Sequence, residues 1–368
     1  MPESIKKIAI NTGGGDAPGL NTVIHGAVYA ARGLGWDVVG IHEGYDGMLE
    51  PERYSDGGLV ELHRSTVREI SHLGGTILGT TNRGNPFRRV VTLPDGSKRE
   101  EDCSDELVQR FRDEHIDALI AIGGDGSLTI ADQLHSKGLR VVGVPKTIDN
   151  DLESTTLTFG FNTAVSFATD CIDRLHSTAL SHRRTMVVEV MGRYAGWIAL
   201  HAGLAGRADA ILIPEIPYSI EKLAADIKRK HDDGKPYSIV VVAEGAKPKG
   251  GEVTVKAREA GQAERLGGIA EVVAEQLQAA TGKESRSLVL GHLLRGGEPT
   301  AMDRNLGVTF GAGAVYALSK GMNGVMVALK PPKLDFVPLQ AAIAKLKLVP
   351  VDGEFVVAAR ILGISFGE

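Results

Sequence analysis

Short apolar runs alternate along this chain with longer segments in which apolar residues recur every three or four positions. Residues 116–122, 185–190 and 237–243 are runs of the first kind, typical of strands that are buried on both faces of a parallel sheet. Residues 104–114 and 162–179 have the helical spacing. This repeated alternation predicts an α/β fold with doubly wound, mainly parallel sheets.

The composition agrees with this fold and restricts the kinds of binding partner that we expect. At 368 residues the chain is long enough for two domains, and 43% hydrophobic residues with only 5% aromatic ones suit a core of Val, Ile, Leu and Ala. The net charge of −5 gives no basis for binding nucleic acid, and no apolar run reaches the ~18 residues of a membrane span. With only two cysteines and no signal-peptide pattern, we expect a cytoplasmic protein without nucleic-acid or membrane partners.

Glycine-rich turns follow two of the predicted strands. Residues 12–21 (TGGGDAPGLN) come after the strand at 5–11, and residues 123–127 (GGDGS) come after the strand at 116–122. Glycines at a strand-to-helix turn let backbone N–H groups approach an anion, and the next helix presents its positive end. Neither turn has the GxGxxG or GxxxxGK(S/T) spacing, so we expect phosphate sites that are neither of the Rossmann nor of the Walker type.

Asp125 is the unusual member of the second turn, because a carboxylate repels bound phosphates unless a cation lies between them. One interpretation is therefore a Mg²⁺ ion that is held at Asp125 and bridges phosphate oxygens. The other interpretation is a tight turn in which the aspartate caps the following helix. The turn alone leaves both open.

A second polar segment, residues 145–151 (PKTIDND), follows the predicted strand at 140–144. Within seven residues it offers two carboxylates, an amide, a hydroxyl and an ammonium group. These groups can supply a base, hydrogen-bond donors and a charge clamp for a reaction. Taken alone, the segment can equally be a capped loop.

Polar residues also follow the predicted strands in the second half of the chain. Arg193, Glu244, His292 and Arg295 come at or just after strand ends, and open α/β sheets bind ligands at the carboxyl ends of their strands. Any one of them is more often structural than functional. Together they predict a site for a phosphorylated, hydroxylated small molecule.

Two residues of the first half have open interpretations. Tyr45 would face a planar group or be a packed surface tyrosine, and Arg83 would face a polyphosphate or be solvated. Residues 90–98 and 247–262 each predict a β-hairpin.

Eight motifs stand along the chain in this order: GGGDAPGLN, GGTILGTTNRGNPF, GGDGS, PKTIDND, SHRR, VVEVMGRYAGW, VAEG and ESRSLVLGHLLRGGEPTAMDR. In order and spacing they resemble the 6-phosphofructokinase family over nearly the whole chain. The resemblance implies a phosphoryl-donor (ATP) domain of residues 1–160 plus about 294–330, and a fructose 6-phosphate domain of residues 161–293 plus about 331–368. It also implies phosphorylation of D-fructose 6-phosphate at the 1-hydroxyl by ATP-Mg, which gives fructose 1,6-bisphosphate and ADP in glycolysis.

The same resemblance implies roles for individual residues. Asp149 would be the general base, Thr147 would position the transferred phosphoryl group, Arg193 would neutralise charge, and Asp151 would support the loop. The donor, with Mg²⁺ on Asp125, would be held by Gly15, Tyr45, Arg83, Gly84, Gly124, Asp125, Gly126 and Ser127. The sugar phosphate would be held by Thr147, Ile148, Asp149, Arg184, Met191, Gly192, Arg193, Glu244, Arg286, His292 and Arg295. Arg184 and Arg286 would reach it across a subunit contact, which implies a homodimer or homotetramer with shared active sites.

Gly126 and Lys146 bear on the choice of phosphoryl donor. In the family that this chain resembles, pyrophosphate users carry aspartate and lysine at these positions and many bacterial ATP users carry glycine at both, so this chain is mixed. An aspartate at 126 would put a charge into the space for the nucleotide's α-phosphate, whereas glycine leaves it open, so we expect ATP. The alternatives are a pyrophosphate-dependent fructose 6-phosphate 1-phosphotransferase and, from a different class, a non-catalytic regulatory subunit with the same fold.

Overall fold

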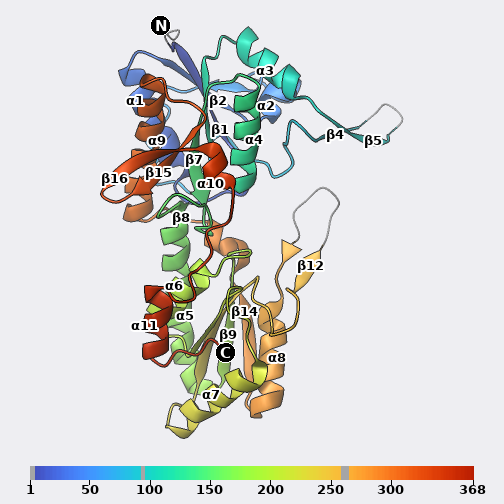
Figure 1. Ribbon diagram of the computed structural model, residues 1–368, viewed down its shortest axis with the longest axis vertical. Helices are drawn as coiled ribbons and strands as arrows, with labels where there is room; N and C mark the ends of the chain where they lie inside the picture. The colour runs from blue at the N-terminus through green and yellow to red at the C-terminus, as the bar shows by residue number, and fades with distance from the viewer. Residues whose placement is uncertain (1–4, 93–95, 258–264) are drawn as a thin grey trace. The chain divides into compact units, whose positions relative to one another are not determined.

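A computed structural model of the chain (Figure 1) describes residues 5–92, 96–257 and 265–368. The chain forms two compact units, here called the first and the second unit. The first unit contains Met1–Thr147, Leu152–Gly160 and Arg295–Lys345. The second unit contains Ile148–Asp151, Phe161–Leu294 and Leu346–Glu368.

The first unit is built on one eight-stranded sheet with the order β16-β15-β7-β6-β1-β2-β3, and β8 pairs with β7 off this path. Strands β15, β7, β6, β1 and β2 are parallel, and the outer strands β16 and β3 run antiparallel to their neighbours. The strand bounds are Lys7–Thr12 (β1), Asp37–Ile41 (β2), Leu59–Glu61 (β3), Ala118–Gly123 (β6), Val141–Thr147 (β7), Phe159–Gly160 (β8), Val325–Lys330 (β15) and Lys333–Pro338 (β16).

Helices cover both faces of this sheet, as a doubly wound fold requires. Helices α1 (Leu20–Gly33) and α9 (Ala301–Ser319) share one apolar cluster with Ile8 and Ile120. Helices α3 (Ser104–Asp113), α4 (Asp125–Ser136) and α10 (Leu339–Ile343) share the opposite cluster with Ala9 and Leu119. Neighbouring residues of one strand therefore point to opposite clusters, which is the period of two that a strand buried on both faces must have.

The second unit has its own four-stranded parallel sheet, β10-β11-β9-β14. Helices α7 and α8 pack on the face that carries Val240 and Leu212. Helix α6 packs on the other face, where a Cβ on Gly203 would lie 2.6 Å from the Ile211 side chain. Helix α5 contacts α6 and the sheet, and α11 contacts α6. The bounds are Thr185–Val190 (β9), Ala210–Leu212 (β10), Ser238–Ala243 (β11), Ser285–Val289 (β14), Phe161–His182 (α5), Trp197–Ala205 (α6), Ile220–Asp232 (α7), Ile269–Thr281 (α8) and Glu354–Ile361 (α11).

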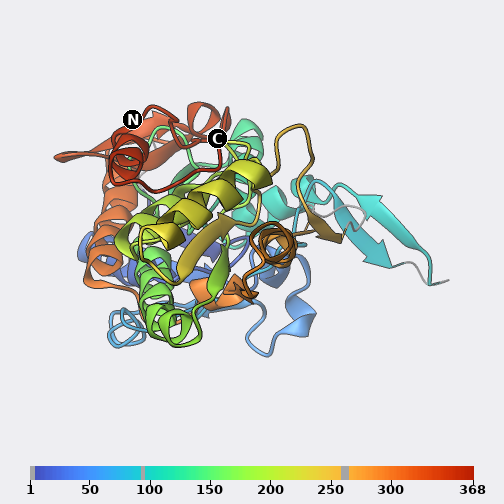
Figure 2. The same ribbon diagram turned by 90° about the horizontal axis from the view of Figure 1, so that it is seen from below.

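Two antiparallel strand pairs lie outside the main sheets. Strands β4 (Arg89–Thr92) and β5 (Lys98–Glu101) form the pair expected near residues 90–98, and Figure 2 shows it projecting from its unit. Strands β12 (Val255–Ala257) and β13 (Arg265–Leu266) form the second pair, near the hairpin expected at 247–262. Residues 93–95 and 258–264, which connect the strands of each pair, lie outside the described residues.

Two segments lie in the other unit than the sequence predicts, and the first is Ile148–Asp151, which belongs to the second unit. Residues 331–345 belong to the first unit, whereas the resemblance implies that they are part of the fructose 6-phosphate domain. The reason is that β16 pairs with β15 from Val325↔Pro338 to Lys330↔Lys333, which ties this segment to the first sheet. None of the helices in the described residues is long and apolar enough to cross a membrane.

Candidate active site

The two glycine turns predicted from the sequence lie side by side in the first unit. They follow β1 and β6, which are adjacent parallel strands, and the Gly13 N–H donates to the Ile122 carbonyl at 2.9 Å. The Ser127 hydroxyl oxygen would lie only 2.7 Å from a Cβ on Gly13, and the Ser127 Cβ would lie 2.2 Å from a Cβ on Gly123. Only glycine allows this close packing, which brings backbone N–H groups of both turns to one edge of the sheet.

The helix-capping interpretation of Asp125 does not match the structure. The N-cap of α4 is Gly124, which has no side chain, and Asp125 is the first helical residue. A carboxylate at that position interacts favourably with the positive end of the helix. The Asp125 side chain is half-buried.

A third segment, Thr80–Gly84, lies against the first glycine turn. The Thr80 hydroxyl donates to the Gly14 carbonyl at 2.6 Å, and the Gly14 N–H donates to the Thr81 carbonyl at 3.1 Å. This contact brings Arg83 and Gly84 near the turn that contains Gly15. The structure therefore brings these predicted donor residues together, although they are about 70 positions apart in the chain.

Two cations lie at the same turn. Lys146, near the end of β7, is only 4% exposed, and its ammonium group donates to the Gly15 carbonyl. Arg295 donates to the Asp16 carbonyl at 3.1 Å, and its Nη1 would lie 2.0 Å from a Cβ on Gly15. Arg295 thus belongs to the first unit and contacts the donor turn, whereas the other strand-end candidates for the sugar site lie in the second unit.

Gly126 differs from the other glycines of the turns because it has space around it. Apart from its chain neighbours and the nearby backbone of α4 itself, no atom of the described residues would lie within 4 Å of a Cβ at this position. Its backbone angle φ is also not in the left-handed region. A side chain at 126 would therefore extend from the turn without disturbing the protein.

Tyr45 is a packed residue rather than an open platform for a planar ligand. It is 4% exposed and belongs to the apolar cluster that contains Met48 and Leu107. Burial raises the pKa of its hydroxyl group. Of the two interpretations of Tyr45, the packed ring is the one that the structure favours, although the ring is buried and not at the surface.

The acceptor candidates Ile148–Asp151 form a buried loop of the second unit. Asp149, Asn150 and Asp151 are 4%, 3% and 6% exposed, and Asn150 adopts a left-handed φ of 51°. The Lys347 ammonium donates to Asn150 Oδ1 at 3.0 Å, and the Lys347 N–H donates to the Asp151 carbonyl at 2.9 Å. The C-terminal segment thus fixes this loop. Just before it, Thr147 ends β7, and its carbonyl accepts a hydrogen bond from Thr158 at 2.7 Å.

The strand-end residues of the second unit converge as the sequence predicts. Met191, Gly192 and Arg193 follow β9, and Glu244 follows the adjacent β11. Glu244 Oε1 accepts a hydrogen bond from the Arg193 N–H at 3.1 Å. Arg193 has a left-handed φ of 49°, an uncommon conformation that is often found at functional sites. The exposed His292 follows β14, on the other side of β9.

Arg184 and Arg286 lie at the opposite end of the same sheet. Arg184 precedes β9 and Arg286 is the second residue of β14, so both are near the amino ends of their strands. Glu284 pairs with both, at 3.4 Å from Arg184 Nη2 and 2.7 Å from Arg286 Nη2. These arginines therefore do not join Arg193 and Glu244 at the carboxyl edge of the sheet.

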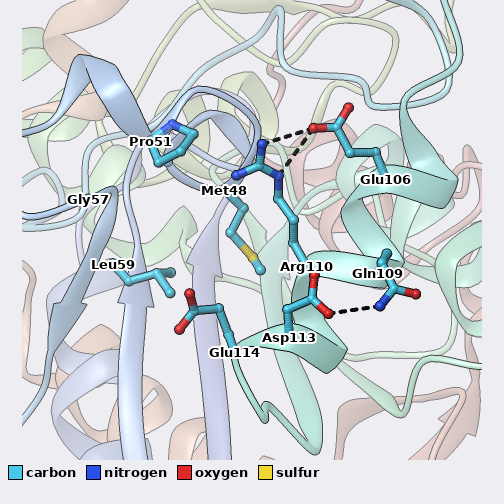
Figure 3. A pocket seen from close by; sticks show the side chains of 10 residues that line it. Met48, Pro51, Gly57, Leu59, Glu106, Gln109, Arg110, Asp113 and Glu114 are labelled. Carbon is cyan, nitrogen blue, oxygen red and sulfur yellow. Dashed lines mark hydrogen bonds and ion pairs between the residues drawn. The ribbon is translucent and has the colours of Figure 1, made fainter.

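One cavity of about 460 Å³ in the first unit is separate from the glycine turns (Figure 3). Met48 and Leu59 supply apolar walls, and Glu106, Asp113 and Glu114 lie on the α3 side. No predicted site residue is among those that line it. We therefore place the candidate active site at the strand ends and not at this cavity.

The fold and the paired glycine turns define a class, the doubly wound α/β proteins with ligand sites at strand ends. The family model described as Phosphofructokinase matches residues 7–318, and the chain belongs to this family. It is 48% identical over 373 residues to "ATP-dependent 6-phosphofructokinase" of Chloroflexus aurantiacus, covering 100% of this chain and 99% of the relative. It is 47% identical over 352 residues to "Pyrophosphate--fructose 6-phosphate 1-phosphotransferase" of Amycolatopsis mediterranei, covering 94% and 97%.

Solved structures agree with the family. The phosphofructokinase structure from Saccharomyces cerevisiae superimposes with a TM-score of 0.78 at 31% identity. The match covers 92% of this chain and 45% of the yeast chain, so this chain spans about half of that protein. The predicted fold class and the predicted family are therefore confirmed, and the chain is an enzyme of this family.

Proposed function

We propose that the protein transfers the γ-phosphoryl group of ATP to the 1-hydroxyl of D-fructose 6-phosphate, which gives fructose 1,6-bisphosphate and ADP in glycolysis. One observation carries the proposal: two glycine turns lie at adjacent strand ends, with the Lys146 ammonium against the first of them. Such a surface of backbone N–H groups beside a buried cation suits a chain of phosphates. Arg83, Gly84 and Gly124–Ser127 complete the proposed donor site.

Mg²⁺ would be held by Asp125 together with the phosphates of the donor. Among the described residues, no three Asp, Glu, His or Cys side chains form a group that would hold a metal. A site with Asp125 as a protein ligand suits Mg²⁺, since proteins often bind this ion through one or two carboxylates plus substrate phosphates. When bound, the ion would neutralise negative charge on the transferred phosphoryl group.

Asp149 is the proposed general base. The 1-hydroxyl oxygen forms a bond to the γ-phosphorus while the bond from that phosphorus to the β-phosphate oxygen breaks. The hydroxyl proton passes to a carboxylate oxygen of Asp149, because a primary alcohol is far too weak an acid to ionise at neutral pH. Thr147 orients the transferred group and Arg193 supplies positive charge, so that most of the catalysis is positioning and charge neutralisation.

The proposed sugar site uses the carboxyl edge of the second sheet. Glu244 accepts hydrogen bonds from sugar hydroxyls, and His292 and the Met191–Arg193 turn surround the sugar phosphate, with Ile148 beside the base. Arg295 stays in the proposed set as a phosphate-binding cation of the first unit, held by the Asp16 carbonyl. We also propose the cytoplasm as the location, because Cys103 and Cys171 are both free thiols.

The donor is tested by measuring fructose 6-phosphate turnover with ATP and with pyrophosphate side by side. We expect ATP to be the better donor, because the space beside Gly126 is open for the α-phosphate of a nucleotide. The second candidate function is the pyrophosphate-dependent reaction, which Lys146 also permits because its ammonium group can balance the charge of either donor. Turnover with pyrophosphate alone would reverse the choice, and no turnover with either donor would indicate a non-catalytic subunit.

A homodimer or homotetramer with shared active sites is part of the proposal. Arg184 and Arg286 lie at the amino edge of their sheet, away from Glu244 and Arg193, so they would serve the site of a neighbouring subunit. We expect Asp149→Asn and Arg286→Ser proteins to be weakly active alone and to regain activity when they are denatured together and refolded. In each mixed dimer one of the two shared sites would have both residues intact, which is about a quarter of all sites in a random one-to-one mixture. If the mixture is no more active than its parents, the arginines do not act across subunits.

A further inference from the structure

Arg89 is a nearly buried arginine that the proposed reaction does not use. It is the first residue of β4, shortly after the donor segment Thr80–Gly84, and it is 9% exposed. Its Nη1 lies 2.9 Å from Asp46 Oδ1, and its Nη2 lies 2.8 Å from Glu50 Oε1. Each end of the guanidinium group therefore binds a different carboxylate, one at the start and one just after the end of helix α2 (Asp46–Leu49).

Arg89 favours the ionised form of the Glu50 carboxyl group. Hydrogen bonding from Arg89 is the main cause that keeps the pKa of the Glu50 carboxyl below its usual range, although burial acts in the opposite direction. Arg53 of the short helix η1 (Pro51–Arg53) also binds Glu50 from the exposed side. A buried arginine with two carboxylates fixes the distance between β4 and α2.

Asp46 connects this cluster to the donor segment. Asp46 Oδ1 would lie 3.4 Å from a Cβ on Gly84, so the carboxylate that Arg89 holds lies directly behind this glycine. Thr81 lies beside the same position, because its Cγ2 would be 2.7 Å from that Cβ. Thr81 in turn accepts the hydrogen bond from Gly14 of the first glycine turn. A continuous series of contacts thus runs from Arg89 through Asp46, Gly84 and Thr81 to the turn.

We propose that Arg89 is a positioning residue for the phosphoryl donor, which acts through Asp46 to hold Arg83 and Gly84 against the first glycine turn. The inference rests on the proposed function, since it assigns the donor to this turn. Its consequence is selective: loss of Arg89 impairs use of ATP and leaves the interaction with fructose 6-phosphate unchanged, because all of the contacts lie in the first unit.

The test compares Arg89→Met and Arg89→Lys with a matched control, Arg99→Met. Arg99 lies on β5 of the same hairpin, and its side chain is 63% exposed beside Glu101. We expect Arg89→Met to raise the KM for ATP about tenfold or more, since hydrogen bonds to charged groups are lost, while the KM for fructose 6-phosphate changes less than about twofold. Lysine has one ammonium group in place of the two-ended guanidinium group, so the KM for ATP of Arg89→Lys should lie between those of the wild type and Arg89→Met. Arg99→Met should have the KM values of the wild type.

Two further measurements separate positioning from general stability. Millimolar guanidinium added to Arg89→Met should lower the KM for ATP again, which a purely structural loss would not do. Asp46→Asn should show the same ATP-selective defect, and it keeps the test usable if Arg89→Met does not fold. Equal changes in both KM values, or a lowered melting temperature with an unchanged KM for ATP, would overturn the inference. Absence of turnover in the wild-type enzyme would instead reject the proposed function.

Discussion

Replacement of Asp149 by asparagine lowers kcat by about 10²- to 10⁴-fold, the usual range for loss of a general base. Asparagine has nearly the same shape, so the buried loop around it is expected to persist. The fructose 6-phosphate complex does not require the proton transfer, and its dissociation constant should therefore stay within about threefold of the wild type. A coupled assay gives kcat, and calorimetric titration with fructose 6-phosphate gives the affinity independently of turnover.

Asp151→Asn is the matched control for this experiment. Asp151 is a second buried carboxylate of the same loop, and its carbonyl accepts a hydrogen bond from the Lys347 N–H. If Asp149 is the base, Asp151→Asn should lower kcat much less than Asp149→Asn does. Near wild-type turnover of Asp149→Asn, or equal losses in both variants, would contradict the assignment of the base.

The strand-and-turn framework could be predicted from the sequence because it depends on local patterns. Buried strands such as β6 and β11 are continuous apolar runs, and each ends where glycine or a polar residue begins. Since the carboxyl ends of parallel strands lie at one edge of a sheet, the convergence of Glu244 with Arg193 followed from their positions alone.

Residues that act through long-range contacts could not be found in this way. Lys347 fixes the Asp149 loop from nearly 200 positions away, and no motif surrounds it. Tyr45 follows a strand end as a ligand-facing residue would, but its ring fills the core beside Met48. Arg295 follows the last strand of the second sheet, yet its side chain contacts the first glycine turn. In each case packing between segments that are distant in the chain determines which residues the side chain contacts.

Replacement of Gly126 by aspartate is the second change with a large expected effect. The site can accept the side chain, since a Cβ at 126 would meet no atom of the described residues within 4 Å apart from its chain neighbours and the nearby backbone of α4. The new carboxylate would extend from a turn that is proposed to hold phosphates, and a close like-charge contact costs several kcal/mol. We therefore expect kcat/KM for ATP to fall about 10²-fold or more, and use of pyrophosphate, which has no α-phosphate at that place, to fall much less.

Gly126→Asn separates charge from size, because asparagine occupies almost the same volume as aspartate without the negative charge. If repulsion of the nucleotide is the cause, Gly126→Asn should keep much more of the activity with ATP than Gly126→Asp. Raising the ionic strength should reduce the difference in activity with ATP between the two variants, since salt screens interactions between exposed charges. An aspartate variant that uses ATP as well as the wild type would show that position 126 does not face the nucleotide. Equal losses of activity with ATP in both variants would show that the size of the side chain at 126, and not its charge, causes the selectivity.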